Sequence, residues 1–169
     1  LKIYLIGSVQ IKNLLMAILA SEKCGIKIQS IFKKIHKIKS VNGRLEEIKE
    51  LPNRSKIFLD YAHTPEALKT AINALKEHYK KKITVVFGCG GERDKPKRKL
   101  MGKIANQLCN KVIITDDNPR NENPKKIRKE LLHLISKNKA LNIGNRKLAI
   151  KKALSKAIPN EVILIAGKG

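Results

Sequence analysis

Residues 83–94 read ITVVFGCGGERD, and this stretch decides the class of fold. Its first five residues are β-branched or aromatic and do not alternate with charged ones, which is typical of a strand buried on both faces. The run leads directly into glycines, which allow a tight turn and a close approach of the backbone to another group. A buried strand followed by such a turn favours a parallel sheet with a ligand site at the strand ends.

Similar β-branched runs lie on both sides of this stretch and alternate with helical patterns. The runs cover residues 56–61, 111–115 and 162–166, with a weaker one at 140–143. Apolar residues three and four apart indicate helices within residues 68–79, 100–108, 127–135 and 149–157. We therefore expect an α/β domain with a Rossmann-like open, mostly parallel sheet flanked by helices.

Three helix starts are marked by residues that cap helices. Thr64-Pro65 and Asn123-Pro124 each place a capping side chain before a proline, whose missing N–H costs nothing at the first helical position. Asn145 is a third predicted cap.

Residues 1–42 show a different pattern. A short strand is expected at residues 3–6, followed by one helix through Leu14 and Ile18 and another over residues 28–35. One strand and two helices cannot bury these apolar faces alone. We therefore expect residues 1–42 to be the tail of a preceding domain and residues 43–169 to be a second domain.

The net charge of +23 suggests a polyanionic partner at first sight. However, 30 of the 37 basic residues are Lys, and the chain has no Trp, three Phe and three Tyr. Nucleic-acid surfaces prefer arginine forks and aromatic platforms, whereas Lys enrichment also follows from A/T-rich codons. We expect no specific nucleic acid as a partner, and a basic nucleic-acid-binding module remains the alternative from another functional class.

The cysteine content and the hydropathy of the sequence indicate the cellular compartment of the protein. The three cysteines are widely spaced and form no Cys-x-x-Cys pair, so neither a disulfide framework nor a zinc site is indicated. The apolar stretch at residues 14–20 is far shorter than the ~20 residues that span a bilayer. No segment resembles a signal peptide. We expect a cytoplasmic protein without a membrane partner.

Polar and glycine residues follow each main strand, where the carboxyl ends of parallel strands meet. Asp60 lies near the end of the first run, before Tyr61, and another run leads into DDNPR at residues 116–120. Arg93 follows the glycine turn, where a guanidinium can pair with a carboxylate through two hydrogen bonds. Each turn alone also fits a plain loop that caps a helix. Four such turns at one edge, with Gly167 in the last, favour a binding site.

Together these turns resemble the Mur ligases, most closely the C-terminal part of the MurE type, which adds the third residue of the peptidoglycan stem peptide. The resemblance runs through nearly the whole chain. Its motifs are Gly7 with Asn13, GRLE at 43–46, DYAHTP at 60–65, GCGGERD at 88–94, DNPR at 117–120 and GKG at 167–169. Motifs of this length in this order are highly specific.

The resemblance implies an ATP-dependent amide ligase. A carboxylate of UDP-N-acetylmuramoyl-L-alanyl-D-glutamate becomes an acyl phosphate, and the amino group of meso-diaminopimelate attacks it. ATP and Mg²⁺ are the implied cofactors, with the Mg²⁺ ligands outside this chain. We expect these small molecules to be the partners and the protein to be a monomer.

In the family the Asp-Asn-Pro-Arg motif selects meso-diaminopimelate over lysine. The resemblance therefore assigns the distal end of that amino acid to Asp117, Asn118, Pro119 and Arg120, and it assigns further contacts with meso-diaminopimelate to Arg93 and Gly167. This agrees with the residue types, because a second zwitterionic head needs a forked cation and fixed polar groups. Lysine would leave these groups unpaired, at a cost of ~1–3 kcal/mol each.

The resemblance assigns contacts with ATP to Asn13, Arg44, Asp60 and His63, and it assigns no catalytic residue to this chain. Gln10 departs from the pattern, because the family has an asparagine at that position of the nucleotide motif.

Large parts of the family's pattern have no counterpart in the sequence. They include the phosphate loop, the Mg²⁺ ligands, the domain that holds the UDP-sugar, and the His-Glu expected after Gly169. The chain also begins with Leu1 instead of Met. We therefore expect a piece of a longer protein that does not ligate by itself, or else an inactive remnant of the ligase gene.

The nucleic-acid alternative makes a separate prediction about salt. Binding that neutralises phosphates weakens with a slope near −0.9 per phosphate on a double-logarithmic plot against salt concentration. We expect the protein to elute from immobilised duplex DNA below ~150 mM salt, as weak phosphate-driven binding does. Retention above that concentration would favour the nucleic-acid-binding module instead.

Overall fold

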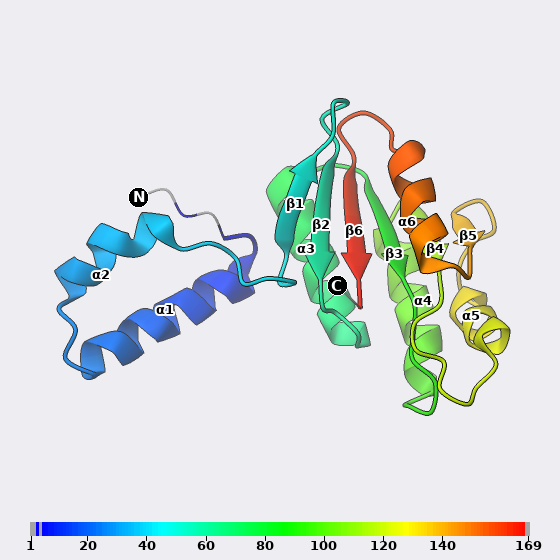
Figure 1. Cartoon of the computed structure of the whole chain (residues 1–169), viewed down its shortest axis with the longest axis horizontal. Coiled ribbons are helices and arrows are strands. Elements are labelled where there is room, and N and C mark those ends of the chain that lie inside the picture. Colours follow the sequence, from blue (N-terminus) through cyan, green and yellow to red (C-terminus); the bar gives the residue numbers. More distant parts are fainter. Residues whose placement is uncertain (1–2, 4, 168–169) are drawn as a thin grey trace.

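A computed structural model describes residue 3 and residues 5–167 of the chain. Its centre is a six-stranded sheet with the order β1-β2-β6-β3-β4-β5 (Figure 1). The strands are β1 (Glu46–Glu50), β2 (Lys56–Asp60), β3 (Ile83–Phe87), β4 (Lys111–Ile114), β5 (Ala140–Asn142) and β6 (Val162–Ala166). All neighbours are parallel except β1 and β2, which are antiparallel. The expected open, mostly parallel α/β sheet is therefore confirmed.

Helices cover both faces of the sheet. They are α3 (Pro65–Tyr79), α4 (Pro96–Leu108), α5 (Pro124–Leu132) and α6 (Arg146–Ser155). The larger core lies between the sheet and α3, α4 and α5, while Ala149 and Ala153 of α6 pack on Val86, Ile113 and Ile163 of the other face. Every residue of β3 and of β6 is buried, which explains why these strands lack polar alternation.

The predicted helix caps are confirmed. The Thr64 hydroxyl accepts a hydrogen bond from the Ala67 N–H, Asn123 accepts from Lys125, and Asn145 accepts from Leu148. Each cap fixes where the chain leaves a strand end and turns into a helix. The caps therefore also fix the loops at the carboxyl edge of the sheet.

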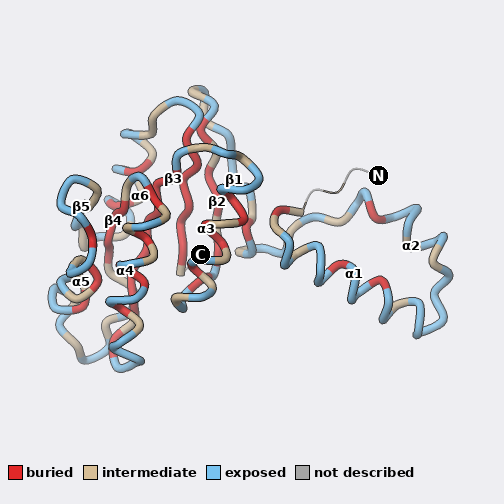
Figure 2. The backbone as a smooth tube through the Cα atoms, turned by 180° about the vertical axis from the view of Figure 1, so that it is seen from behind, coloured by how far each residue is buried: buried red, intermediate tan, exposed pale blue. Residues whose placement is uncertain are grey.

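The N-terminal segment extends away from the sheet (Figure 1). It contains α1 (Ser8–Lys23), α2 (Ile28–Lys34) and the short 3-10 helix η1 (Ile35–Lys37). Leu14, Ile18 and Ile35 form a small core of their own, whereas Leu15 and Leu19 are more than half exposed (Figure 2). The expectation of two helices with incompletely buried faces is thus met.

Two local predictions differ from the structure. The expected strand at residues 3–6 is wrong for Ile3, Leu5 and Ile6, which lie in no strand, while Tyr4 lies outside the described residues. Conversely, β1 was not predicted. Its sequence, EEIKE, is charged and mostly exposed, because it is an edge strand paired with β2 alone.

The described part of the chain holds no helix long and apolar enough to span a membrane.

Replacing Asn145 with Ala tests the cap of α6. The variant loses the hydrogen bond that the Asn145 side chain accepts from the Leu148 N–H, 3.0 Å away. We expect the free energy of unfolding to fall by about 1 kcal/mol, measured by urea denaturation. Lys147→Ala, on the same exposed turn, is the control and should change stability by less than about 0.5 kcal/mol.

Candidate functional site

The loops that follow β2, β3, β4 and β6 meet at the carboxyl edge of the sheet. The Gly91 N–H donates a hydrogen bond of 2.8 Å to the Asn118 carbonyl, and Arg120 Nη1 donates one of 2.6 Å to the Gly91 carbonyl. The Gly167 N–H donates one of 3.0 Å to the Asp60 carbonyl. Four turns that lie far apart in the sequence therefore join into one surface.

The glycine turn after β3 needs its glycines because the neighbouring loop lies against its backbone. A Cβ atom at Gly88 would lie 2.4 Å from the Thr115 carbonyl oxygen, and one at Gly91 would lie 1.9 Å from the Pro119 oxygen. Both distances are shorter than any real Cβ contact, so a side chain would push the loops apart. The glycines thus allow the close approach of two backbones that the sequence of this turn indicated.

The loop Asp117–Arg120 is held in shape by its own side chains. Asp117 Oδ1 accepts a hydrogen bond of 2.6 Å from the Asn118 N–H, and Asn118 Oδ1 accepts one of 3.2 Å from the Arg120 N–H. Arg120 has a positive φ of 49° and is exposed apart from its bond to Gly91. The carboxylate of Asp117 approaches Gly167, at 3.9 Å from the position of a Cβ there. Asp117, Asn118, Pro119, Arg120 and Gly167 therefore lie together.

Arg93 lies at the same edge of the sheet, at the far end of the glycine turn. It is exposed and follows Glu92, which has a positive φ of 51° and accepts a hydrogen bond of 2.8 Å from Asn121 Nδ2. The glycine turn is thus attached to the segment that follows Arg120. Both arginines have side chains open to solvent at the edge where the strands end.

Arg98 is a residue of this region that the sequence did not single out. It is fully buried on α4 and donates hydrogen bonds to the carboxylates of Glu122 and Glu130 and to the Gly90 carbonyl. The Arg98 guanidinium lowers the pKa of Glu122 to about 2. In the sequence PKRK, nothing distinguishes this arginine from the solvated lysines around it.

Arg146, at the start of α6, approaches the same edge from the opposite layer. Its Nη2 donates a hydrogen bond of 3.1 Å to the carbonyl of Ala166, the last residue of β6. Burial lowers the pKa of Arg146, and the nearby Asp117 carboxylate opposes that shift. Sequence reasoning missed this residue too.

The glycine turn also contains Cys89, which is buried against Met101. Burial raises the pKa of the Cys89 thiol to about 11, so the thiol is protonated at neutral pH and is a poor nucleophile. Among residue 3 and residues 5–167, no group of three or more His, Cys, Asp or Glu side chains could hold a metal ion.

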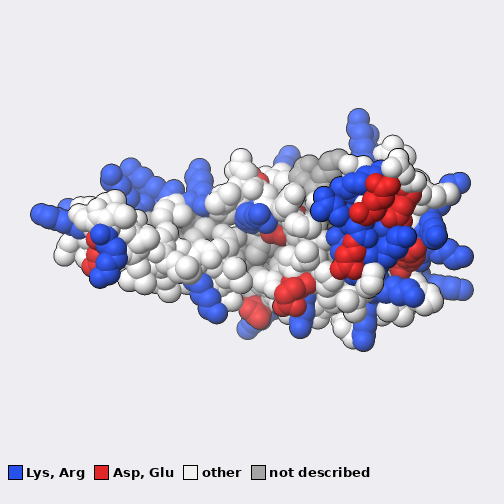
Figure 3. All heavy atoms as spheres, turned by 90° about the horizontal axis from the view of Figure 1, so that it is seen from below, with Lys and Arg blue, Asp and Glu red and all other residues white. Residues whose placement is uncertain are grey.

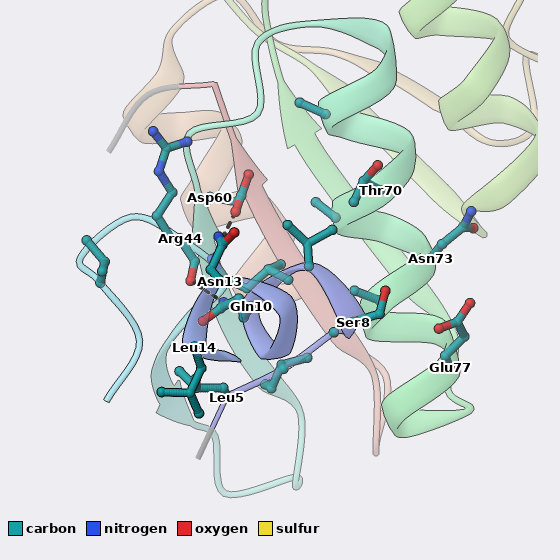
Figure 4. A pocket seen from close by; sticks show the side chains of 18 of the residues that line it. Leu5, Ser8, Gln10, Asn13, Leu14, Arg44, Asp60, Thr70, Asn73 and Glu77 are labelled. Carbon is teal, nitrogen blue, oxygen red and sulfur yellow. Dashed lines mark hydrogen bonds between the residues drawn. The ribbon is translucent and has the colours of Figure 1, made fainter. Parts of the chain in front are cut away.

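A second group of predicted residues lines a cavity of about 1040 Å³ between the N-terminal segment and α3. Asn13, Arg44 and Asp60 lie at one end of it, together with Gln10 (Figure 4). His63 does not line this cavity: it is exposed, and its Nδ1 lies 3.0 Å from the Tyr61 carbonyl. The structure therefore brings three of the four predicted ATP contacts together.

Asp60 also has a structural role, which could not be predicted from the sequence. Its Oδ2 accepts a hydrogen bond of 2.9 Å from the Leu45 N–H, and its Oδ1 accepts one of 2.8 Å from the Ala62 N–H. The carboxylate thereby joins the end of β2 to the segment that carries Arg44. Gln10 adds a link from α1, because its Nε2 donates a hydrogen bond of 2.8 Å to the Arg44 carbonyl.

The charge of the molecule is spread over its surface. Seen from below, basic side chains intermingle with acidic ones over the sheet domain and form no continuous basic face in that view (Figure 3).

Comparison with known proteins gives three concordant results. The family model described as "Mur ligase, glutamate ligase domain" matches residues 43–169. The UDP-N-acetylmuramoyl-L-alanyl-D-glutamate--2,6-diaminopimelate ligases of Buchnera aphidicola subsp. Schizaphis graminum and Rickettsia montanensis are each 44% identical over 98% of this chain. A solved structure of a ligase with that name is 36% identical and covers 98% of the chain, with a TM-score of 0.72.

These matches concern only part of the related proteins. The chain covers 33% and 34% of the two curated relatives and 34% of the chain in the solved structure. It thus spans about a third of the length of the proteins that it matches.

Replacing Asp60 with Asn tests whether its carboxylate joins β2 to the segment at residues 43–45. The variant keeps one acceptor oxygen but turns an amide N–H₂ toward a backbone N–H, so one buried donor loses its partner. We expect the free energy of unfolding to fall by about 1–3 kcal/mol, with faster hydrogen exchange at the Leu45 or Ala62 amide.

The matched control is Glu77→Gln, which removes one carboxylate charge from the exposed end of α3. It should leave stability within about 0.5 kcal/mol of the unmodified chain. Equal unfolding curves for all three proteins would show that the Asp60 carboxylate does not join these segments.

Proposed function

Because the chain belongs to the Mur ligase family, by its glutamate ligase domain, we propose that it forms the amino-acid-binding end of an ATP-dependent ligase. The proposed reaction adds meso-diaminopimelate to UDP-N-acetylmuramoyl-L-alanyl-D-glutamate. The observation that carries the proposal is the joining of the Gly88–Asp94 turn to the Asp117–Arg120 loop by the hydrogen bonds at Gly91. This joining places two solvent-facing arginines at one edge.

The proposed site fits an amino acid with a zwitterion at each end. The guanidinium groups of Arg93 and Arg120 suit the distal carboxylate, because an arginine fork pairs with it through two hydrogen bonds. The Asp117 carboxylate suits the distal ammonium group. The Asn118 and Pro119 carbonyls already accept hydrogen bonds from the Gly91 and Glu122 N–H groups, so a ligand would have to use their second lone pairs. Gly167 leaves the space beside Asp117 free, since a Cβ there would lie 3.6 Å from the Ala62 carbonyl oxygen and 3.9 Å from the Asp117 carboxylate.

Selection against lysine follows from the same groups. Lysine has an ammonium group at its distal end but no carboxylate, so it would leave the arginine forks without their partner. Lysine would therefore lack the charge-assisted hydrogen bonds that a distal carboxylate makes with Arg93 and Arg120. Such bonds contribute about 1.5–3 kcal/mol each, and 1.4 kcal/mol corresponds to a factor of ten in binding.

The ATP side of the proposal rests on Asn13, Arg44 and Asp60. ATP would supply the phosphate that activates the substrate carboxylate. The Arg44 guanidinium is exposed, lies 5.1 Å from the centre of the Tyr61 ring, and could pair with phosphates there, as could Lys39, which also lines the cavity. Asp60 already accepts two backbone hydrogen bonds, so a ribose would have to use its remaining lone pairs. His63 does not line this cavity, so the cavity does not support a contact between His63 and ATP.

We further propose that the ligation needs parts of a longer protein. No ligand set for Mg²⁺ is found among the described residues, and the chain covers about a third of its relatives. The Mg²⁺ ligands and the site of the UDP-sugar would then lie in those other parts. This chain would position the incoming amine for attack.

Arg120→Ala in the full-length ligase tests the proposed amino-acid site. We expect the KM for meso-diaminopimelate to rise at least tenfold, because losing a charge-assisted hydrogen bond costs about 1.5–3 kcal/mol. The KM for ATP should change less than twofold. Both constants are measured by steady-state phosphate release.

Arg54→Ala removes an equally exposed arginine from the β1–β2 turn, at the other end of β2 from Asp60, and is the control. It should leave both KM values unchanged. Equal increases in the two KM values for Arg120→Ala would contradict the assignment of Arg120 to the amino acid.

A further inference from the structure

A buried ion pair lies directly beneath the two loops of the proposed amino-acid site. Arg98 is fully buried, and its guanidinium faces Glu122 with both terminal nitrogens, each 2.9 Å from a carboxylate oxygen. Arg98 Nη2 also donates a hydrogen bond of 3.2 Å to the Gly90 carbonyl. One guanidinium thus holds the glycine turn and the segment that follows Arg120 at a fixed separation.

Glu122 connects the same two loops a second time. Its backbone N–H donates a hydrogen bond of 3.0 Å to the Pro119 carbonyl, so Glu122 belongs to the Asp117–Arg120 loop. Its Oε1 also accepts a hydrogen bond of 2.5 Å from the Glu92 N–H in the glycine turn. Glu92 has a positive φ of 51°, a conformation that costs a non-glycine residue energy and needs support from its surroundings.

We propose that Arg98 and Glu122 are positioning residues, which set the distance between Arg93 and Arg120 and so determine affinity for the distal carboxylate of the amino-acid substrate. The inference rests on the proposed function. Arg98 is fully buried and acts through the two loops that it joins. Arg93 directly follows Glu92, and Arg120 lies two residues before Glu122, so any shift of this pair moves both side chains.

The chemistry of the pair favours a fixed geometry. A guanidinium paired to a carboxylate by two parallel hydrogen bonds fixes direction as well as distance. The pairing lowers the pKa of Glu122 to about 2, so the carboxylate is charged at every pH at which such an enzyme would work. The link is therefore permanent and does not act as a pH switch.

Glu130 provides an internal control. It lies on α5 and accepts a hydrogen bond of 2.8 Å from Arg98 Nη1, so it shares the guanidinium with Glu122. The side chains of Glu122 and Glu130 are similarly exposed, at 16% and 25%. Of the two carboxylates, only that of Glu122 accepts a hydrogen bond from the glycine turn among the bonds of the described residues. Removing either leaves Arg98 with one acidic partner.

The experiment compares Glu122→Ala with Glu130→Ala in the full-length ligase. For Glu122→Ala we expect the KM for meso-diaminopimelate to rise at least tenfold, while kcat and the KM for ATP change less than about threefold. Glu130→Ala should leave all three within about threefold of the unmodified enzyme. Glu122→Gln keeps an oxygen for the Glu92 N–H and should recover part of the affinity.

A second measurement uses the 169-residue chain and does not depend on ligation. Amide hydrogen exchange and ¹⁵N chemical shifts at Glu92 and Arg93 should change in Glu122→Ala and stay as in the unmodified chain in Glu130→Ala. Thermal melting of both variants shows whether their stabilities are comparable. If Glu122→Ala does not fold, Glu122→Gln, which loses one of the two carboxylate oxygens that face Arg98, is compared with Glu130→Gln in both measurements, and a smaller but still selective rise in the KM for the amino acid is expected.

The outcomes separate this inference from the function on which it rests. An unmodified ligase that does not use meso-diaminopimelate would overturn the proposed function and the substrate named here with it. A working ligase in which the two alanine variants have equal KM values, or unchanged amides at Glu92 and Arg93, would overturn the positioning role alone. A selective rise in the KM for the amino acid, together with changed amides, is the supporting result.

Discussion

The candidate site depends on how closely two loop backbones approach each other. Gly88 and Gly91 lie so near the Thr115 and Pro119 carbonyls that no side chain fits between them. Because β3 and β4 are adjacent and parallel, their carboxyl ends point to the same edge, and the absent side chains let the loops touch there. The arginines, the Asp117 carboxylate and the buried Arg98 network all take their positions from this contact.

The two proposed ligand regions are connected through β2 and β6. The Asp60 carboxylate holds the segment of Arg44, and the Asp60 carbonyl accepts from Gly167 at the other region. One residue at the end of a strand thus contacts both the cavity beside α1 and the edge where β6 ends. A shift of Asp60 would therefore change the positions of residues in both regions.

Most of the sheet and its helix caps could be predicted from the sequence, because buried strands and capping residues have strong local patterns. β2, β3, β4 and β6 are apolar, and Thr64, Asn123 and Asn145 precede helices. β1 was missed because an exposed edge strand has no such pattern. Arg98 was missed because a charged side chain among lysines gives no local sign of burial: its partners lie 24 and 32 residues away. The second role of Asp60 likewise depends on a contact across 15 residues.

Among the residues that the structure describes, β6 follows all the other strands in sequence, yet it lies between β2 and β3 in the middle of the sheet. On a ribosome, the β1–β2 pair and the β3–β4–β5 group would therefore emerge without the strand that joins them. Until Val162–Ala166 is synthesised, β2 and β3 each present an unpaired edge, and such edges invite pairing with other chains. The placement of one strand thus makes closure of the sheet wait for residues 162–166, about 75 residues after β3.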